Sequence, residues 1–439
     1  MKQMKFSPVL LLCLFLLTTV SAQKAPLLTL EDAVSIALKN NYNIKLAKNS
    51  TTIAATNVTI GNAGYLPVAS ADLTTNSSIQ NINQTRSDGT VNKINRLHNS
   101  SYSYGPNINW TIFNGFAMFA NYDQLKQLNK LSEVQERDTI QSTLVAVISS
   151  YYNLVNQNQQ IISLKEAINI SRTQLRYASD KYSVGRASKL DVLNAQVNLN
   201  TDTANFLTQV QLFRTTKIRL NQLLVRKLDE DFSVPDTIQI QNQIVLNDII
   251  NQAQTANPAI LSSLLNKRLS EINLRQVRAV RYPVLGVNSG YTISNSKTPA
   301  GFTQTQNTKG LNYGLTATVN IFDGFNQLRR ERVAKLQMNS ADIRISQIQQ
   351  EIEAQINSLY INYLSGLDLI RLEQSNVEIA KKNLDISLEK YRLGNITPLE
   401  VREAQRNYID AQTRYFNDQY QTKLSEVSLK EVTGSINLD

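Results

Sequence analysis

A stretch of sixteen residues that occurs twice is the feature that most constrains this chain. KYSVGRASKLDVLNAQ begins at Lys181 and KYRLGNITPLEVREAQ begins at Lys390, an offset of 209 residues. Lys, Tyr, Gly, Leu, Val, Ala and Gln recur in register between the two. Such a long-range repeat indicates a duplicated structural unit. We therefore expect two copies of one fold, with the repeated stretch at a place that matters for function.

Residues 1–22 have the pattern of a secretory signal peptide. Two lysines precede an apolar run, and residues 20–22 are small enough for cleavage just before Gln23. The only cysteine, Cys13, lies inside the apolar run, and a lipoprotein site would need a small residue where a leucine precedes it. We therefore expect export, followed by a mature chain that contains neither thiols nor disulfides.

Two segments alternate apolar and polar residues in the way that strands do. Residues 102–112 and 311–321 each place Tyr, Ile, Leu or Val on one face and Asn, Ser, Thr or Gly on the other. A weaker alternating segment precedes each of them. The sequence thus predicts one β-hairpin in each unit, at about 65–113 and about 282–322.

The predicted strands suit an outer membrane. After residue 22 no apolar run approaches the roughly 18 residues that a membrane-spanning helix needs. Strands of about 10 residues, tilted near 45°, do span the hydrocarbon layer, and their polar face suits a water-filled lumen. Four strands cannot close a barrel, and lipid leaves open edges unsatisfied. The chain is therefore expected to oligomerise, and the strand count alone leaves a dimer possible.

Very long helices are predicted after each hairpin. From Gly115 to Gly185 and from Gly324 to Gly394 the chain runs 70 residues, which as a helix would span roughly 100 Å. An apolar residue recurs every seven positions in both, as in supercoiled helices. The stripes are Ile140, Val147, Leu154, Ile161, Ile168, Leu175 and Tyr182, then Ile356, Tyr363, Ile370, Val377, Leu384 and Tyr391. Each glycine then marks the tip of a helical hairpin.

These elements divide the chain into a signal peptide and two repeats. Residues 23–232 hold a first helix, the first strand pair and the helical hairpin with its tip near Gly185. Residues 233–439 repeat that order, with the second tip near Gly394. A capping pattern at Thr29 marks the start of the first helix.

With these residues assembled, the sequence resembles the TolC family of outer-membrane efflux proteins over essentially all of the mature chain. The marks of the resemblance are the two repeated motifs, with Tyr182 and Gly185 in one and Tyr391 and Gly394 in the other. The resemblance implies a mostly α fold with a β-barrel part. Three chains would form a twelve-stranded transmembrane barrel, continued by a periplasmic barrel of long coiled-coil helices.

The same resemblance implies location and partners. The chain would serve as the passive exit duct of a tripartite efflux pump or a type I secretion system. It would lie in the outer membrane of a Gram-negative bacterium, reach into the periplasm, and contact lipid, a periplasmic adaptor and an inner-membrane transporter. The tips would dock the adaptor, although Arg186 and Asn395 replace the leucine that usually follows the tip glycine. The expected contacts are Ser183, Val184, Gly185, Arg186, Leu393, Gly394, Asn395 and Thr397.

A carboxylate gate at the periplasmic mouth is a further expectation. Glu400 and Glu403 are three residues apart on one helix, so their carboxylates can share a face. They stand where family members carry acids that ring the constriction, and Asp191 is the equivalent position in the first repeat. The alternative is an ordinary solvated face, with Arg402 and Arg406 neutralising Glu403.

Other classes of function find little support in the sequence. The only histidine, His98, lies between predicted strands without a ligand cluster, and we expect neither catalytic residues, a metal nor another cofactor. The formal charge of +10 is distributed along helices among acidic and amide residues, which favours solvated helix faces over a nucleic-acid partner. An exported coiled-coil structural or adhesive protein is the remaining alternative, although it would not need two strand pairs at equivalent places.

Overall fold

The computed structural model describes residues 26–241, 243–301 and 303–434. The predicted signal peptide, residues 1–22, lies outside the described residues. The helices are α1 Leu30–Asn40, α2 Tyr42–Thr56, α3 Ala117–Ser183, α4 Lys189–Leu224, α5 Leu246–Ala256, α6 Pro258–Ala279, α7 Asn326–Leu393 and α8 Pro398–Val432. The strands are β1 Val68–Thr85, β2 Val91–Asn114, β3 Val284–Lys297 and β4 Thr305–Thr318.

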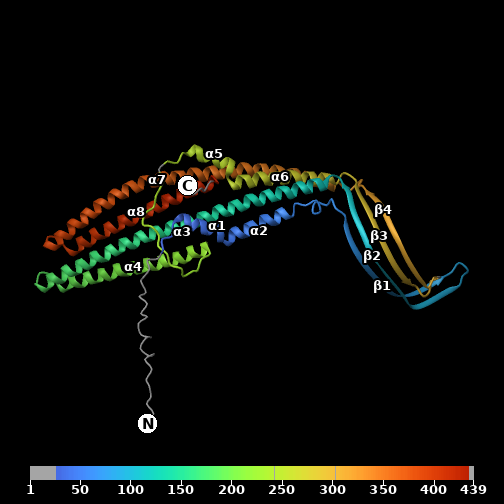
Figure 1. The fold of residues 1–439 in the computed structure, drawn as a ribbon, viewed down its shortest axis with the longest axis horizontal. Helices are drawn as coiled ribbons and strands as arrows, with labels where there is room; N and C mark the ends of the chain where they lie inside the picture. The colour runs from blue at the N-terminus through green and yellow to red at the C-terminus, as the bar shows by residue number, and fades with distance from the viewer. Residues whose placement is uncertain (1–25, 242, 302, 435–439) are drawn as a thin grey trace, which may run out of the picture.

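Two very long helices set the dimensions of the molecule. α3 has 67 residues and α7 has 68, so each extends about 100 Å at 1.5 Å per residue. Both run from the sheet at one end to the tips at the other, where α4 and α8 turn back beside them (Figure 1). The predicted fold class, long coiled-coil helices with four strands per chain, is confirmed. No helix among the described residues is long and apolar enough to cross a membrane.

The four strands form one antiparallel sheet in the order β1-β2-β3-β4. The first predicted hairpin corresponds to residues 68–114. The second, predicted to reach residue 322, ends at Thr318, so the prediction was wrong at that end. The reason is the pairing: Thr318 lies opposite Val284, the first residue of β3, so residues 319–322 have no strand beside them in the same chain.

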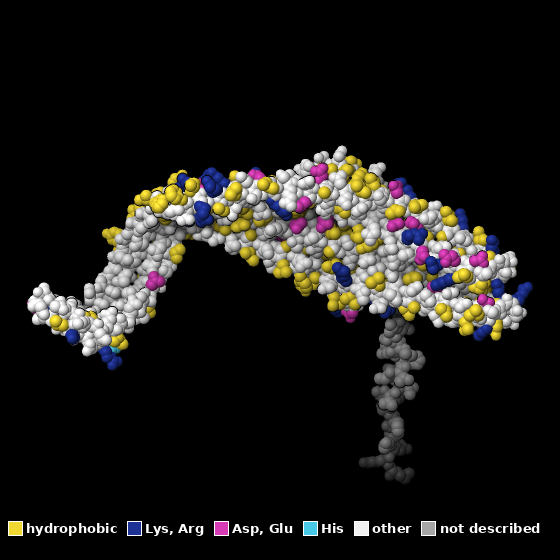
Figure 2. Space-filling model, turned by 180° about the vertical axis from the view of Figure 1, so that it is seen from behind, with side chains coloured by type: hydrophobic (Ala, Val, Ile, Leu, Met, Phe, Trp, Pro, Cys, Tyr) yellow, Lys and Arg dark blue, Asp and Glu magenta, His cyan; other side chains and the backbone are white. Residues whose placement is uncertain are grey.

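One face of the sheet is apolar and the other is polar, as the alternation predicted. Cross-strand pairs match the faces, for example Leu73 with Tyr104 and Val287 with Leu315. Asn107 lies opposite Gly290 on the polar face. Figure 2 shows Lys and Arg interspersed with Asp and Glu over the helices, whereas the sheet carries few charges on the face in view. An apolar outer face and a polar inner face with few charges suit a lipid-embedded, water-filled channel.

The apolar core lies at the middle of the long helices rather than at their ends. Val147 and Leu154 of the predicted stripe are fully buried in it, together with Leu220 of α4 and Phe232 of the segment that joins α4 to α5. Toward the tip, however, the stripe on α3 leaves the seam and Tyr182 is exposed. The residues buried there are small or polar instead: Ala167, Ser171, Gln174 and Ala178.

An asparagine breaks the helix before the sheet in both halves of the chain. Asn41, between α1 and α2, accepts from the backbone N–H of Asn43 at 2.8 Å and donates to the carbonyl of Leu223 at 2.8 Å. Asn257, 216 residues later, caps α6 in the same way and donates to the carbonyl of Val432 at 2.8 Å. Each side chain therefore ties the start of one helix to the end of a returning one.

We expect Asn257→Ala to loosen the first turn of α6. It removes the cap, which contributes about 1 kcal/mol, and the bond to the Val432 carbonyl. Hydrogen exchange at residues 259–262 should accelerate roughly fivefold for each kcal/mol lost. Asn257→Asp is the matched variant, because it keeps the cap and replaces the donor to the Val432 carbonyl with a buried carboxylate oxygen. Equal exchange in the Ala variant and the native chain would contradict the capping role.

Candidate functional site

The two tips are built alike and lie side by side at the end of the helices far from the sheet (Figure 1). Gly185 has φ +71° and Gly394 has φ +88°, in the left-handed region that favours glycine. After each glycine the backbone N–H reaches back five residues, from Arg186 to the Lys181 carbonyl at 2.7 Å and from Asn395 to the Lys390 carbonyl at 2.9 Å. This is a Schellman motif, which ends a helix by reversing the chain.

A capping box begins the returning helix after each tip. Ser188 caps α4 and exchanges hydrogen bonds with Asp191, whose carboxylate accepts from the Ser188 backbone at 2.9 Å. Thr397 caps α8, and the carboxylate of Glu400 accepts from its backbone N–H at 2.8 Å. Two of the three predicted gate carboxylates thus satisfy the first turn of a helix. That role explains why an acid recurs at this position of the repeat.

The environment of Glu400 keeps its carboxylate ionised. The backbone N–H of Thr397 lowers its pKa below the ordinary value of 4.5, and the Thr397 hydroxyl adds to this effect. Because the folded pKa is depressed, the contribution of this cap to stability is complete above 4.5 and is lost as the pH falls through the lowered pKa. At neutral pH the position therefore carries a full negative charge on the exposed surface.

Glu403 differs from the other two acids because it belongs to no cap. It is exposed, and the two arginines that could neutralise it have other partners. Arg402 forms an ion pair with Asp202 at 2.8 Å, and Arg406 lies 3.9 Å from Asp410. Among the described residues, no ion pair involves Glu403. Of the three predicted acids, its charge is the one without an evident structural purpose.

A hollow of about 520 Å³ separates the two tips. At its edge the Lys181 ammonium lies 4.0 Å from the ring centre of Tyr391 and donates to the Tyr391 carbonyl. Burial lowers the pKa of Lys181, and Arg186 lowers it further. Asp191 also lines the hollow. Lys181 therefore joins the tips, a contact that the paired KY dipeptides did not reveal.

The hollow collects some of the predicted docking residues but not all. Val184, Arg186, Leu393 and Gly394 line it, and Val184 and Leu393 are each more than 60% exposed. The other predicted residues do not line it: Ser183, Gly185, Asn395 and Thr397. Ser183 donates to the carbonyl of Asp180 at 2.7 Å, and Thr397 is engaged as the cap of α8. Of the predicted docking residues, the hollow thus collects two exposed apolar side chains, one arginine and one glycine.

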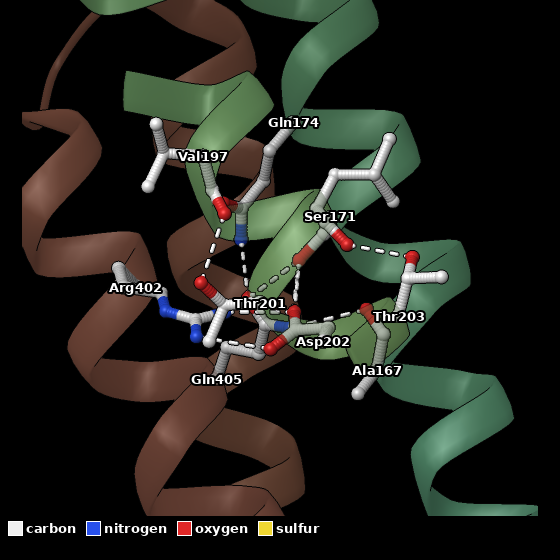
Figure 3. Close-up of polar contacts among 10 residues, drawn as sticks. Ala167, Ser171, Gln174, Val197, Thr201, Asp202, Thr203, Arg402 and Gln405 are labelled. Carbon is white, nitrogen blue, oxygen red and sulfur yellow. Dashed lines mark hydrogen bonds and ion pairs between the residues drawn. The ribbon is translucent and has the colours of Figure 1, made fainter. Parts of the chain in front are cut away.

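A buried polar cluster lies about a dozen residues from the tips, and the sequence analysis did not anticipate it. Asp202 of α4 receives both ends of the Arg402 guanidinium from α8, at 2.8 and 2.9 Å (Figure 3). Gln405 of α8 donates to Asp202 at 3.0 Å, and the hydroxyl of Ser171 on α3 also donates to it. Gln174 of α3 donates to Gln405 at 3.0 Å. Three helices of the two hairpins therefore meet around one carboxylate.

A sequence signal for this cluster did exist. In α4 an apolar residue also recurs every seven positions, at Val192, Leu199 and Phe206. Asp202 follows Leu199 by three residues, which is the second apolar position of that heptad. A charged residue at such a position must be paired, and its side chain is indeed only 7% exposed. The partner could not be read from the sequence, because Arg402 is 200 residues away.

The seam between the two helical hairpins is polar along much of its length. Asn156 bonds to Asn417 at 3.1 Å, and Glu166 accepts from the Tyr408 hydroxyl at 3.2 Å. Ser163 donates to Gln412 in the same seam. Within the second hairpin the contact is apolar, with Leu384 packed in one cluster with Tyr408. Hydrogen-bond geometry therefore fixes how one hairpin lies against the other.

Comparison with known proteins gives consistent matches. The family model described as "Outer membrane efflux protein" matches residues 33–225 and 249–435. The chain is 22% identical over 426 residues to the outer membrane efflux protein BepC of Brucella suis, covering 96% of this chain and 89% of that one. It is 20% identical over 443 residues to the proteases secretion protein PrtF of Dickeya chrysanthemi, covering 99% and 93%.

A solved structure has the same fold. The Campylobacter jejuni CmeC outer membrane channel superposes with a TM-score of 0.72 at 21% identity, covering 92% of this chain and 85% of that one.

We expect Arg402→Met to destabilise the tip end of the helices by on the order of 3 kcal/mol, because it leaves the buried Asp202 carboxylate without its cation. Hydrogen exchange in α4 around Asp202 reports the loss. Arg406→Met is the matched control on the same helix, where an exposed pair contributes at most about 0.5 kcal/mol. Similar losses of stability in the two variants would show that the buried pair of Arg402 and Asp202 contributes no more than an exposed pair.

Proposed function

This chain belongs to the outer membrane efflux protein family, and we propose that three copies assemble into one continuous duct from the periplasm to the outside. The family consists of channel proteins, and the chain is an outer-membrane export channel. In the proposed trimer, three four-stranded sheets make a twelve-stranded barrel in the outer membrane. The long helices continue that barrel into the periplasm.

One observation carries this proposal: the sheet, with its apolar and polar faces, stands at the end of helices about 100 Å long. In lipid the backbone groups of an open sheet edge go unsatisfied, so the strands must close into a ring. A coiled-coil structural or adhesive protein, the alternative raised by the sequence, would have no use for such a sheet.

The tips are proposed to dock a periplasmic adaptor that links the duct to an inner-membrane transporter. The hollow between them is lined by the exposed side chains of Val184 and Leu393 beside Arg186, which would receive an apolar, partly acidic hairpin. One relative is named for efflux and another for secretion of proteases. We therefore propose that cargo is selected by the docked transporter and not by the duct.

Asp191, Glu400 and Glu403 are proposed to form rings of negative charge at the periplasmic mouth. In a trimer each position would occur three times around the axis, and like charges in a narrow pore hold cations. Arg402 does not neutralise the ring, because Asp202 engages it. The capping roles of Asp191 and Glu400 are compatible with this, because a capping carboxylate keeps its charge.

Conductance in planar bilayers tests the duct and its gate together. The native trimer should form channels that a trivalent cation blocks from the periplasmic side. We expect Glu403→Gln to weaken that block about tenfold, because it removes three charges from the mouth of the trimer. Adding Glu400→Gln and Asp191→Asn should weaken the block further, because it removes six more charges. The amide replacements are chosen because glutamine and asparagine leave a capping box largely in place, whereas alanine would remove it.

The control for the gate is Glu378→Gln, an exposed acid on α7 away from the tip. It should leave the block unchanged. An undiminished block in the triple variant would reject the gate and leave the duct intact. A native protein that forms no channels at all would reject the duct itself.

The docking proposal is tested at the tip glycines. Gly185→Val and Gly394→Val should abolish export in cells, because a β-branched residue at φ above +70° costs about 1–2 kcal/mol or forces the reversal to change. Barrel and core lie far away, so trimer yield and single-channel conductance should stay native. Gly394→Asn is the matched control, since asparagine tolerates the left-handed region. Normal export by both Val variants would contradict docking at these tips.

A further inference from the structure

The two halves of the chain meet in the sheet at one junction, which is the pairing of β2 with β3. Among the described residues, the sheet also has two edges at which no further strand pairs. β2 of the first half pairs with β3 of the second from Ser100 with Lys297 to Asn114 with Val284. β1 and β4 are the outer strands and have a neighbour on one side only. If the halves are equivalent, the outer edges are two sides of a second junction of the same kind.

The pairing within the two hairpins shows that the halves are equivalent to the residue. Adding 216 to a residue of β1 gives its counterpart in β3, and adding 209 to one of β2 gives its counterpart in β4. Val68 lies opposite Asn109, and their counterparts Val284 and Thr318 lie opposite each other. The correspondence holds as far as Gln80 with Leu97, which becomes Ser296 with Gln306.

We propose that β4 pairs with β1 of the next copy in the register that β2 and β3 already use. The inference rests on the proposed trimer and adds its residue-level contact. Asn109 opposite Asn288 becomes Thr318 opposite Asp72 of the next copy. The pairs at the helix end of the sheet follow in the same way: Thr316 with Thr74, Ala317 with Leu73, Val319 with Ala71, Asn320 with Ser70, Phe322 with Ala69 and Asp323 with Val68, each second residue belonging to the next copy.

The faces of the two strands agree with this register, although they had no part in deriving it. Ala317 and Val319 meet Leu73 and Ala71, all on the apolar face, while Thr318 meets Asp72 on the polar face. A slip by one residue would turn every apolar side chain of one strand toward the lumen. The faces therefore exclude odd slips and leave only slips by two residues to be tested.

The proposal also explains why β4 ends earlier than β2. Residues 319–322 correspond to Trp110–Phe113, which are part of β2 because β3 lies beside them. In the single chain Ile321 is 92% exposed and Phe322 is 71% exposed. A neighbouring β1 supplies the missing partner, so these residues become strand only when copies assemble.

The glycine that follows each strand shows the same difference. A side chain at Gly115 would collide with the carbonyl of Ala279 at 2.1 Å, because the end of α6 packs there. A side chain at the equivalent Gly324 would meet, among the described residues, only Asn326, at 3.8 Å. The counterpart of Ala279 is Ala63, which in the trimer would come from the next copy. The open surface at Gly324 is therefore the place for a second copy of this chain.

Disulfide trapping tests the register. Cys13 is the only natural cysteine and lies in the predicted signal peptide, so introduced pairs are read without background. Thr318→Cys with Asp72→Cys should oxidise to covalent trimers, because directly opposite Cα atoms lie about 4.5–5.5 Å apart, within disulfide reach. Asn109→Cys with Asn288→Cys is the matched intrachain pair, which should close without any change in chain mass.

The competing arms combine Thr318→Cys with Ser70→Cys or with Thr74→Cys. Each mimics a slip by two residues, which adds about 6.6 Å along the strand, and should cross-link roughly tenfold more slowly. Fastest trapping in either arm, or a native trimer that none of the three pairs traps, would overturn the proposed register. A native chain that is monomeric in detergent would overturn the trimer itself, and its mass distinguishes that result.

Discussion

The unpaired backbone groups at the two edges of the sheet are the constraint on which this structure depends. In water an edge strand is solvated, but in the hydrocarbon layer each unsatisfied N–H or C=O costs several kcal/mol. A four-stranded sheet with an apolar face can therefore persist in a membrane only inside a closed ring. Closing the ring brings the helices of neighbouring copies side by side, and since α3 and α7 are continuous, the ring at the sheet is carried to the tips.

The duplicated sequence builds both halves of the chain with the same local contacts, so that each contact occurs twice. Tyr151 donates to the carbonyl of Leu28, and the equivalent Tyr360 donates to that of Ile244. Where equivalent positions carry different residues in the two halves, the same two positions still contact each other, through a different type of interaction. The rings of Tyr65 and Tyr122 meet at 6.3 Å in the first half, and an ion pair of Arg281 and Glu331 takes their place in the second. The two halves thus share the positions that contact each other more closely than they share the residue types at those positions.

Features set by local pattern could be predicted from the sequence, and features set by distant partners could not. The long helices follow from an apolar residue every seven positions, and the left-handed turns follow from single glycines that interrupt this pattern. The end of β4 depends on which strand lies beside it, and the setting of Asp202 depends on an arginine 200 residues away. The roles of Asp191 and Glu400 show a third case, because the acid at each position caps a helix and also stands where we propose a charged mouth. The division of the chain at residues 232 and 233 stays a prediction.

The place where the halves differ in length shows which part of the sheet is free to change. The first hairpin is seven residues longer between equivalent positions, and the excess lies beyond Asn81 and Arg96, at the end of the sheet far from the helices. There β1 and β2 continue as a strand pair, whereas β3 already ends at Lys297 and β4 begins at Thr305. The junction between β2 and β3 and the second hairpin both begin at the other end of the sheet, where Val284 faces Asn114 on one side and Thr318 on the other. Residues added beyond the last shared pair therefore change neither the pairing that closes the ring of strands nor the positions at which the helices join the sheet. The outward-facing loops can vary in length while the ring of strands remains complete.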